Sequence, residues 1–307
     1  MHSLRTPDER FVDLPDYPFE PHYVAISDQS GGTLRVHYLD EGPADGPVVL
    51  AMHGEPSWSY LYRKMIPLLV AGGARVICPD LVGFGKSDKP SEQSDYTYAR
   101  HVAWMQEAII DHLDLRDATF FGQDWGGLVG LRLVAENPER FARVVIGNTG
   151  LPNGEAAPSQ AFLDWQKFSQ ESPVFPIGQI LQGATNTELI DAEVAAYDAP
   201  FPDETFKEGA RIFPSLVPTS ADDPAVPDNL AAWEVLKAWD KPFICCFSDD
   251  DPVTAGGDKP FLKLVPGAQG QPHVLVENAH HFFQEDGAPQ LAQIVLDAIA
   301  AGEVGTS

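Results

Sequence analysis

Gly122-Gln123-Asp124-Trp125-Gly126-Gly127 is the stretch that decides how this chain folds. The apolar, β-prone run 118–121 precedes it, and residues 128–136 have the composition of a helix. The order is therefore strand, sharp turn and helix, with one acidic side chain at the turn. Glycines are needed on either side of that side chain because a Cβ there would collide with the neighbouring strand or helix. The stretch predicts either a reactive aspartate on a tight turn or, more simply, an Asp124 that caps the following helix.

The chain around this turn alternates short apolar runs with helical patterns. Two alternating runs at 23–26 and 34–39 flank a glycine pair and predict an antiparallel hairpin. Continuous apolar runs follow at 47–52, 74–78, 119–121, 144–146, 242–247 and 273–276. Continuous runs separated by helical patterns are typical of parallel strands that are covered on both faces. The sequence therefore predicts an α/β fold with a mostly parallel central sheet and helices on both faces.

Two helices of this fold can be located from the sequence. The first begins at Tyr98, where apolar residues recur at steps of three and four up to Leu113. The second is expected at 289–300, after the last strand.

A long insertion interrupts the predicted sheet. The segment between Thr149 and the strand at 242–247 is several times longer than the ~12 residues that a strand crossover needs. It is rich in Pro, Phe and Trp and has helical patterns at 160–171 and 186–196. We therefore expect a helical cap over the carboxyl edge of the sheet. The expected division is a first part of the core at 1–150, the cap at 151–232 and a second part of the core at 233–307.

Composition excludes several classes of function. The chain has 307 residues with 45 acidic and 20 basic side chains, a net charge of −25, which would be repelled by nucleic acids and anionic membranes. No apolar run reaches the ~18 residues of a membrane span, and the N-terminus lacks the apolar segment of a signal peptide. We expect a monomeric, cytoplasmic protein. Cys78, Cys245 and Cys246 fall in predicted strands as packing residues, and no residue cluster with ligand spacing predicts a metal or a cofactor.

A reactive Asp124 would favour one kind of chemistry. A carboxylate is already ionised at neutral pH and, unlike serine, needs no base to make it nucleophilic. If it displaced a leaving group from a saturated carbon, the product would be an ester that a histidine-activated water could hydrolyse. The site would then need an oxyanion hole, a histidine with a carboxylate partner, and a receptor for the leaving group.

The spacing Gly-x-Asp-x-Gly matches the nucleophile turn of α/β-hydrolases, which indicates where the first two of these parts lie. The oxyanion hole is expected from the backbone N–H groups of Trp125 and Glu55, although the loop around Glu55 is equally consistent with a plain strand-to-helix turn. The chain order nucleophile, acid, histidine makes both His280 and His281 candidates for the base. The acid is expected within Asp249-Asp250-Asp251-Pro252, where two of the three carboxylates must belong only to an acidic turn.

Together with these positions, four segments of the chain resemble the haloalkane dehalogenase family of α/β-hydrolases. The segments are Gly122–Gly127, His53–Trp58, Asp80–Pro90 and His281–Glu285, and the likeness runs from about Tyr23 to the end of the chain. The resemblance implies an α/β-hydrolase fold and the hydrolysis of haloalkanes to a primary alcohol, a halide and a proton through an ester on Asp124. It implies a small apolar halogenated substrate and no cofactor.

The resemblance also selects among the candidate residues. It assigns the base to His281, because the family histidine is followed by Phe, a hydrophobic residue, Gln and Glu, whereas His280 replaces a usual glycine. It favours Asp251, which stands directly before proline, as the acid, and Asp249 remains the alternative. In other branches of the family the acid follows the strand before the one at 242–247. In this chain that earlier strand is 144–146, and the position after it is Asn148.

The same resemblance supplies a receptor for the leaving group. A departing halide needs neutral donors in a dry pocket, and an indole is a donor on an apolar body. The resemblance assigns this role to Trp125 and to Trp165 of the cap, and it expects Phe162 in the pocket wall, accompanied by Phe168 and Phe175.

Two other functions compete with this interpretation. Epoxide hydrolases share the aspartate turn but use cap tyrosines as acids, and Tyr197 is the one tyrosine between Leu151 and Val235. A catalytically silent hydrolase fold that binds a small apolar ligand is the third possibility, although the chain retains Asp124, His281 and a nearby acid.

Overall fold

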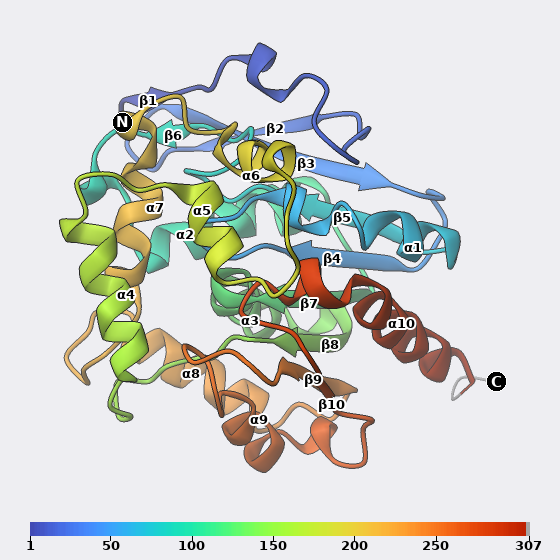
Figure 1. The fold of residues 1–307 in the computed structure, drawn as a ribbon. Helices are drawn as coiled ribbons and strands as arrows, with labels where there is room; N and C mark the ends of the chain where they lie inside the picture. The colour runs from blue at the N-terminus through green and yellow to red at the C-terminus, as the bar shows by residue number, and fades with distance from the viewer. Residues whose placement is uncertain (305–307) are drawn as a thin grey trace.

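A mixed eight-stranded sheet forms the centre of the computed structural model, which describes residues 1–304 (Figure 1). The strands lie in the order β10-β9-β8-β7-β4-β5-β3-β2. Their bounds are β2 His22–Ser27, β3 Thr33–Glu41, β4 Val48–Met52, β5 Arg75–Pro79, β7 Ala118–Gln123, β8 Phe141–Gly147, β9 Phe243–Ser248 and β10 Val274–Val276. All pairs from β10 to β5 are parallel, and β3 runs antiparallel to both β5 and β2. The predicted parallel sheet with an antiparallel hairpin at its edge is confirmed.

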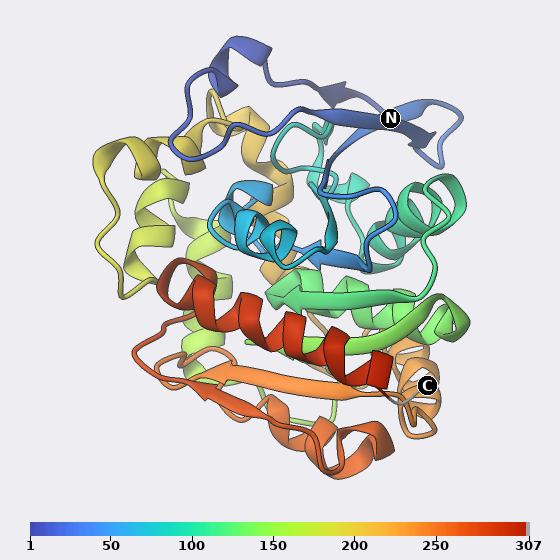
Figure 2. The same ribbon diagram turned by 90° about the vertical axis from the view of Figure 1, so that its right-hand side faces the viewer.

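Helices cover both faces of the sheet, as the sequence predicts. Helices α1 (Ile66–Ala71) and α10 (Phe283–Val304) lie side by side on one face (Figure 2). On the other face α3 (Asp124–Glu136) packs against β7 and contacts both α2 (Tyr98–Met105) and α8 (Val226–Leu236). Helix α9 (Asp258–Leu264) packs against β9.

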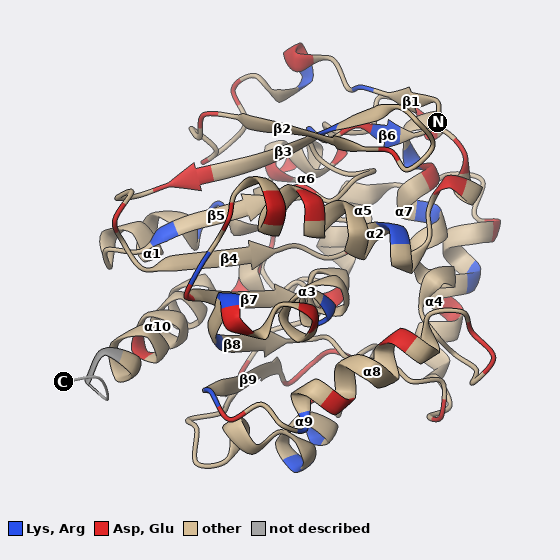
Figure 3. Cartoon of the chain, turned by 180° about the vertical axis from the view of Figure 1, so that it is seen from behind, with Lys and Arg blue, Asp and Glu red and all other residues tan. Residues whose placement is uncertain are grey.

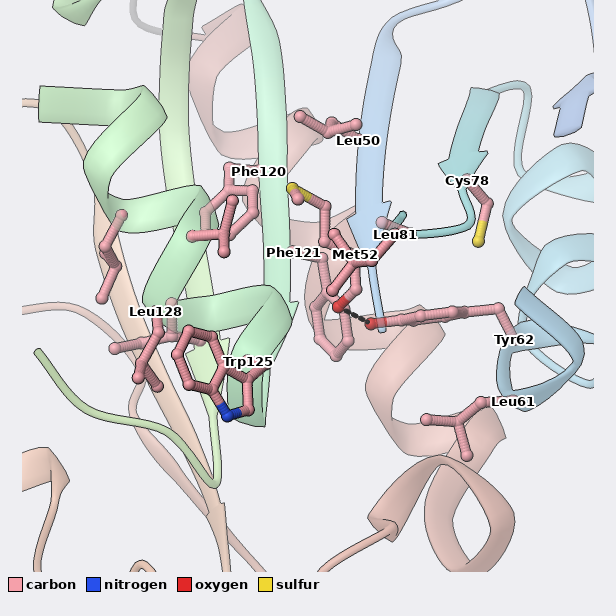
Figure 4. Close-up of a cluster of buried hydrophobic side chains, with 14 of the residues drawn as sticks. Leu50, Met52, Leu61, Tyr62, Cys78, Leu81, Phe120, Phe121, Trp125 and Leu128 are labelled. Carbon is pink, nitrogen blue, oxygen red and sulfur yellow. Dashed lines mark hydrogen bonds between the residues drawn. The ribbon is translucent and has the colours of Figure 1, made fainter. Parts of the chain in front are cut away.

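The core beneath the predicted active site is formed by β4, β7 and the helices beside them. Leu50, Met52, Phe120 and Phe121 are fully buried (Figure 4), and burying each such side chain stabilises the fold by about 1.5–3 kcal/mol. The Tyr62 hydroxyl donates to the backbone carbonyl oxygen of Met52 at 2.8 Å, which fixes the end of β4. The strand ends that carry the predicted catalytic loops therefore rest on a closely packed layer.

Several elements differ from the sequence prediction at their ends. The helix predicted from Tyr98 continues beyond Met105 as a π-helix over Gln106–His112. Helix α10 begins at Phe283, before the predicted 289, because a kink at Gly287 allows the chain to pass Pro289, whose ring cannot continue a regular helix. The short pair of β1 (Ser3–Leu4) with β6 (Lys89–Pro90) was not predicted, since two residues carry no periodic signal.

Four helices of the inserted segment lie at the end of the sheet toward which the parallel strands point (Figure 3). They are α4 (Gln160–Glu171), α5 (Ile177–Gly183), α6 (Asp191–Asp198) and α7 (Glu208–Ile212). Helix α4 has the predicted bounds, whereas α6 starts five residues after the predicted 186. The expected boundary between 232 and 233 falls inside α8, so the division into core and cap stays a prediction.

A buried ion-pair network joins this segment to the core. The Arg63 guanidinium is fully buried and donates both to Glu193 of α6 and to Glu285 of α10. The Tyr197 hydroxyl of α6 also donates to Glu285. Because removing one partner of a buried ion pair leaves an uncompensated charge, this network fixes α6 over the core.

The remaining predictions about composition concern cysteines and membranes. Cys78, Cys245 and Cys246 are free thiols and buried, as expected of packing residues. No helix within residues 1–304 combines the length and the apolar character needed to cross a membrane.

Candidate active site

Asp124 lies on the predicted turn between β7 and α3, in a left-handed backbone conformation with φ of 50°. Such a conformation is uncommon outside glycine and is found at functional turns. The turn closes tightly, because a Cβ at Gly126 would lie 2.0 Å from the carbonyl oxygen of Met52 and one at Gly122 would lie 2.3 Å from the Phe120 ring. The prediction that both glycines are required is confirmed.

The loop after β4 brings a backbone donor to Asp124. The Glu55 N–H donates to Oδ1 of Asp124 at 2.7 Å. A Cβ at Gly54 would lie 2.4 Å from both Cβ and Oδ1 of Asp124, so only glycine lets the two segments approach. The predicted oxyanion donor of Glu55 is therefore within reach of the predicted nucleophile, and Trp125 follows Asp124 at the first turn of α3.

The predicted base lies between the predicted nucleophile and the predicted acid. Nδ1 of His281 is 2.9 Å from Oδ2 of Asp251, and Nε2 is 3.5 Å from Oδ2 of Asp124. Asp251 is held by the Val253 N–H at 2.9 Å and by the Thr254 hydroxyl. The structure thus brings together Asp124, His281 and Asp251 from the ends of β7, β10 and β9.

The neighbouring candidates for base and acid have other partners. Asp249 accepts from the N–H groups of Asn278 and Ala279, both at 3.2 Å, and so holds the loop that leads to the histidines. Nδ1 of His280 accepts the backbone N–H of His281 at 2.7 Å. Neither side chain joins the hydrogen-bonded chain of Asp124, His281 and Asp251.

The charges of Asp251 and His281 depend on each other because the two side chains are in contact. Burial opposes ionisation of Asp251, but the adjacent His281 and the hydrogen bonds from Thr254 and Val253 hold the pKa of Asp251 well below its usual range. Burial likewise lowers the pKa of His281, but the charges of Asp251 and Asp124 and their hydrogen bonds outweigh it and raise that pKa to about 10. Both shifts favour an ionised Asp251 beside a protonated His281 in the resting site.

Glu55 behaves differently, although its amide faces Asp124. Burial raises the pKa of the Glu55 carboxyl well above its usual range, and the charge of Asp124 raises it further. Oε1 of Glu55 is buried without a hydrogen-bond partner within the described residues. Burial and the charge of Asp124 thus favour the neutral form of this carboxyl, whereas the charge of His281 and a hydrogen bond with Trp165 oppose them.

Two amide side chains that sequence reasoning did not assign hold the three loops together. The Asn148 amide donates to the backbone oxygens of His281 at 2.9 Å and His280 at 3.0 Å, and its own backbone oxygen accepts the Asp124 N–H at 3.0 Å. The Gln123 amide nitrogen donates to the His281 backbone oxygen at 3.1 Å and lies 3.2 Å from Nε2 of that ring. Their positions, directly after β8 and directly before Asp124, are the signal that could have identified them.

A cavity of about 860 Å³ opens above these residues. Glu55, Asp124, Trp125 and His281 line one end of it, and Phe162 and Trp165 of α4 face it from the cap. Figure 4 shows Trp125 at the start of α3, beside Leu128. The predicted nucleophile, base and halide donors thus border one space.

The expected aromatic wall is only partly correct. Phe162 lines the cavity, but Phe168 and Phe175 do not belong to its wall. Their rings pack against Trp165, with centroids 5.9 and 5.6 Å away; Phe168 lies on α4, and Phe175 lies in the segment between α4 and α5. Both residues therefore support Trp165 from behind.

The structure also bears on epoxide hydrolysis, which would need a tyrosine of the cap as its acid. Within residues 1–304 no tyrosine lines the cavity, and the Tyr197 hydroxyl is engaged by Glu285. In the same part of the chain no group of three or more His, Cys, Asp or Glu side chains is arranged to hold a metal ion.

Comparison with known proteins agrees with this geometry. A family model described as alpha/beta hydrolase fold matches residues 47–288. The chain is 58% identical to a haloalkane dehalogenase of Psychrobacter cryohalolentis over 299 residues, which are 97% of this chain and 98% of that protein. It is 51% identical to a haloalkane dehalogenase of Mycolicibacterium paratuberculosis over 96% of this chain and 98% of that protein. Among solved structures, the tetrameric haloalkane dehalogenase DpaA from Paraglaciecola agarilytica superposes with a TM-score of 0.88 and 37% identity, covering 98% of both chains.

Proposed function

The chain belongs to the haloalkane dehalogenase family of α/β-hydrolases, and from this premise we propose that it hydrolyses haloalkanes to a primary alcohol, a halide and a proton. The observation that carries the proposal is the alignment of Asp124, His281 and Asp251 at one end of a largely apolar cavity. The proposed substrate is a small apolar haloalkane, and no cofactor takes part.

In the proposed first step Asp124 attacks the carbon that bears the halogen. The Glu55 N–H holds Oδ1, so Oδ2 is the oxygen that approaches the carbon from the side opposite the halogen. A C–O bond forms as the carbon–halogen bond breaks, and the halide leaves with the bonding electron pair. The attack needs no base, because the nucleophile is already a carboxylate.

We propose that the indole N–H groups of Trp125 and Trp165 receive the departing halide. Both side chains line the cavity, one from the start of α3 and one from α4. Charge develops on the halogen only in the transition state, so donors that point at it there lower the barrier and do not merely bind substrate.

The proposed second step uses the histidine that the first step spares. Once Asp124 is an ester its charge is gone, and His281 loses one of the two carboxylates that hold its proton. Its pKa then falls, the ring releases its proton to solvent, and the neutral Nε2 can take a proton from water. The hydroxide formed attacks the ester carbonyl carbon, while the Glu55 and Trp125 N–H groups stabilise the oxyanion. Collapse of this intermediate expels the alkoxide, which takes the proton from His281, and leaves a carboxylic acid on Asp124. That acid passes its proton to His281, which restores the carboxylate and the imidazolium, so the net proton released is the one that went to solvent.

A halide-release assay tests the proposed activity. The protein should release bromide from 1-bromobutane and from 1,2-dibromoethane, with one equivalent of acid for each turnover. An epoxide of equal length, 1,2-epoxybutane, should not be opened, because no cavity-lining tyrosine within residues 1–304 can protonate its oxygen. Diol formation without bromide release would replace dehalogenation with epoxide hydrolysis, and inactivity on all three compounds would favour a silent fold.

We also propose that the protein is a cytoplasmic monomer. The excess of acidic side chains supports the proposal, because like charges repel when two copies approach. The related DpaA is tetrameric, so the two states must be separated by measurement. Light scattering should give the mass of one 33.5 kDa chain, and a fourfold mass would overturn the proposal.

A further inference from the structure

The cavity extends well beyond the residues that the proposed reaction uses. We call its second part the outer lobe, and define it by the cavity-lining residues Gly150, Leu230, Trp233, Gly256, Pro260 and Leu264. It lies between α8, α9 and the loops that follow β8 and β9. None of these six residues has a role in the steps above, so the space beside them needs its own account.

One face of α8 forms a fixed apolar wall of the outer lobe. Leu230, Trp233 and Lys237 are spaced by three and four residues, which places them on one side of the helix. Trp233 is buried, and its indole N–H donates to the backbone oxygen of Leu151 at 2.8 Å. Because its one polar atom is satisfied elsewhere, Trp233 presents only its ring to the cavity.

Apolar side chains also stand at the solvent end of the lobe. Leu230 is 43% exposed and Leu264 is 39% exposed, and both line the cavity. A large apolar side chain held at the surface favours burial by an apolar partner. Since these two line the same cavity as Asp124, an apolar molecule that enters the site can cover them.

Glycines keep the floor of the lobe open. A Cβ built at Gly150 has no atom within 4 Å, and one at Gly256 would meet only the flexible end of Lys259 at 3.4 Å or beyond. A side chain at either position would therefore project into free space and not into the core. Gly150 therefore takes no space from the cavity that it lines together with Asp124 and α8.

Size and charge of the cavity narrow the class of ligand. Its volume of about 860 Å³ is near the upper end of the ~300–1,000 Å³ typical of sites for drug-sized molecules, far more than a two-carbon halide fills. The Lys237 ammonium at its rim is paired with Glu234 at 2.7 Å, and Glu155 also lines the opening. With its cation already paired and a net charge of −25 on the chain, the lobe favours a neutral chain over an anionic one.

We propose that the outer lobe binds the hydrocarbon chain of long, neutral 1-haloalkanes of about eight carbons or more, and that these are preferred substrates. The halogen end then lies at Asp124 and the chain runs along Leu230, Trp233 and Leu264. This inference rests on the proposed dehalogenation and deepens it by naming the substrate class. It predicts that each methylene buried in the lobe raises kcat/KM by up to about fourfold, the factor that corresponds to ~0.8 kcal/mol of transfer free energy.

A pair of matched variants tests the proposal. Gly150→Leu should fill the floor of the lobe, whereas Gly183→Leu adds the same side chain at an exposed glycine of α5 that also has no atom within 4 Å of a built Cβ and does not line the cavity. Bromide release would be measured for 1-bromobutane and 1-bromodecane. In the wild type and in Gly183→Leu, kcat/KM should be at least ~10-fold higher for 1-bromodecane, and Gly150→Leu should abolish that preference.

Leu230→Trp enlarges an exposed side chain at the rim and leaves the core unchanged. It should also lower the ratio of kcat/KM for 1-bromodecane to kcat/KM for 1-bromobutane. Equal kcat/KM for the two bromoalkanes in the wild type, or an unchanged ratio in both lobe variants, would overturn the proposal.

Binding of the product alcohols separates this inference from the proposed activity. By calorimetry, 1-decanol should bind the wild type at least ~10-fold more tightly than it binds Gly150→Leu. If that difference is found but no bromoalkane releases bromide, the lobe binds long chains and the proposed dehalogenation fails. If bromide is released but 1-decanol binds both proteins equally, the proposed activity stands and the outer-lobe inference is wrong.

Discussion

The two sides of the cavity are held in different ways. On the core side, Asp124, His281 and Asp251 follow the ends of parallel strands and are linked to one another and to backbone groups of the same loops. On the cap side, Trp165 and Phe162 lie on α4. The structure describes every residue of this helix, and Ser169 is the only one of them that is buried. Helix α4 is held by polar contacts such as the bond from Gln166 to the Pro214 backbone oxygen at 3.2 Å, and by packing of Trp165 against Phe175.

This difference indicates a division of labour. The core fixes the groups that make and break bonds to Asp124, where small displacements cost large factors in rate. The cap supplies the second donor for the halide and part of the apolar wall, from a helix that has less to hold it in place. We therefore expect substitutions on the core side to reduce turnover more than equivalent substitutions on the cap side.

The largest effect is expected from Asp251→Asn. The imidazolium formed during water attack would lose its charged partner, and Nδ1 would lose the acceptor that orients the ring. Hydrolysis of the ester should fall by about 10⁴-fold, as it does when the same group is changed in serine triads, while alkylation of Asp124 is far less affected. Single-turnover kinetics with a bromoalkane resolve the two steps.

Asp249→Asn and Asp250→Asn are the matched controls for this prediction. Asp249 holds the loop through two backbone N–H groups that an amide oxygen can also accept, and Asp250 is exposed. Both variants should turn over at close to the wild-type rate. Accumulation of the ester in Asp249→Asn and not in Asp251→Asn would move the acid to Asp249.

The two halide donors give a direct comparison between core and cap. Trp125→Phe and Trp165→Phe each remove one indole N–H, and the loss of one oriented donor should lower the alkylation rate by about 10²-fold. The effect should be the larger for Trp125, because its backbone is part of the turn that fixes Asp124. Halide quenching of tryptophan fluorescence should weaken in both variants. Full activity and halide affinity in Trp165→Phe would show that the cap contributes no donor.

The smallest effect concerns stability and pH. The folded-state pKa of His281, about 10, is above its ordinary value near 6.5, so its contribution to stability is fully present below about pH 6.5 and is lost as pH rises through 10. The wild type should therefore lose unfolding free energy relative to His281→Gln as the pH rises from 7 to 10, because the folded protein releases the His281 proton over that range. Thermal unfolding at several pH values measures this difference.

The cap offers the control for the pH prediction. Phe162→Leu replaces a side chain of α4 that neither titrates nor forms hydrogen bonds, so its stability relative to the wild type should stay constant over the same range. A difference for His281→Gln that also stays constant would mean that the free protein does not hold an imidazolium between Asp251 and Asp124.

The sequence predicted the core side of the molecule better than the cap side. Strand runs such as 119–121 are continuous and apolar because they are buried on both faces. A run of this kind between helical patterns indicates a buried parallel strand. The residues brought together at their ends followed from chain order and from the family resemblance. Glu55, Asp124, Asp251 and His281 lie where they were expected, and their roles in the reaction remain proposals.

Other parts could not be read from the sequence for physical reasons. From the sequence, Phe168 and Phe175 looked equivalent to Phe162. Which side of α4 faces the cavity, and where the segment after α4 places Phe175, depend on tertiary packing that leaves no local signal. The hydrogen bonds of Asn148 to the His281 backbone, and the buried ion pairs of Arg63, depend on contacts between residues far apart in the chain. The outer lobe lies between α8 and α9, and its size depends on how these two helices pack, which the sequence pattern does not indicate.

The most direct test of the account is whether an ester on Asp124 can be trapped. In His281→Ala the carboxylate can still displace bromide, but no base remains to activate water. After incubation with 1-bromobutane, intact-mass spectrometry should show one butyl group per protein, peptide mapping should place it on Asp124, and about one bromide should be released per chain. His280→Ala should turn over without accumulating an adduct. Continued turnover by His281→Ala, or bromide release without any adduct on Asp124, would contradict the proposed mechanism.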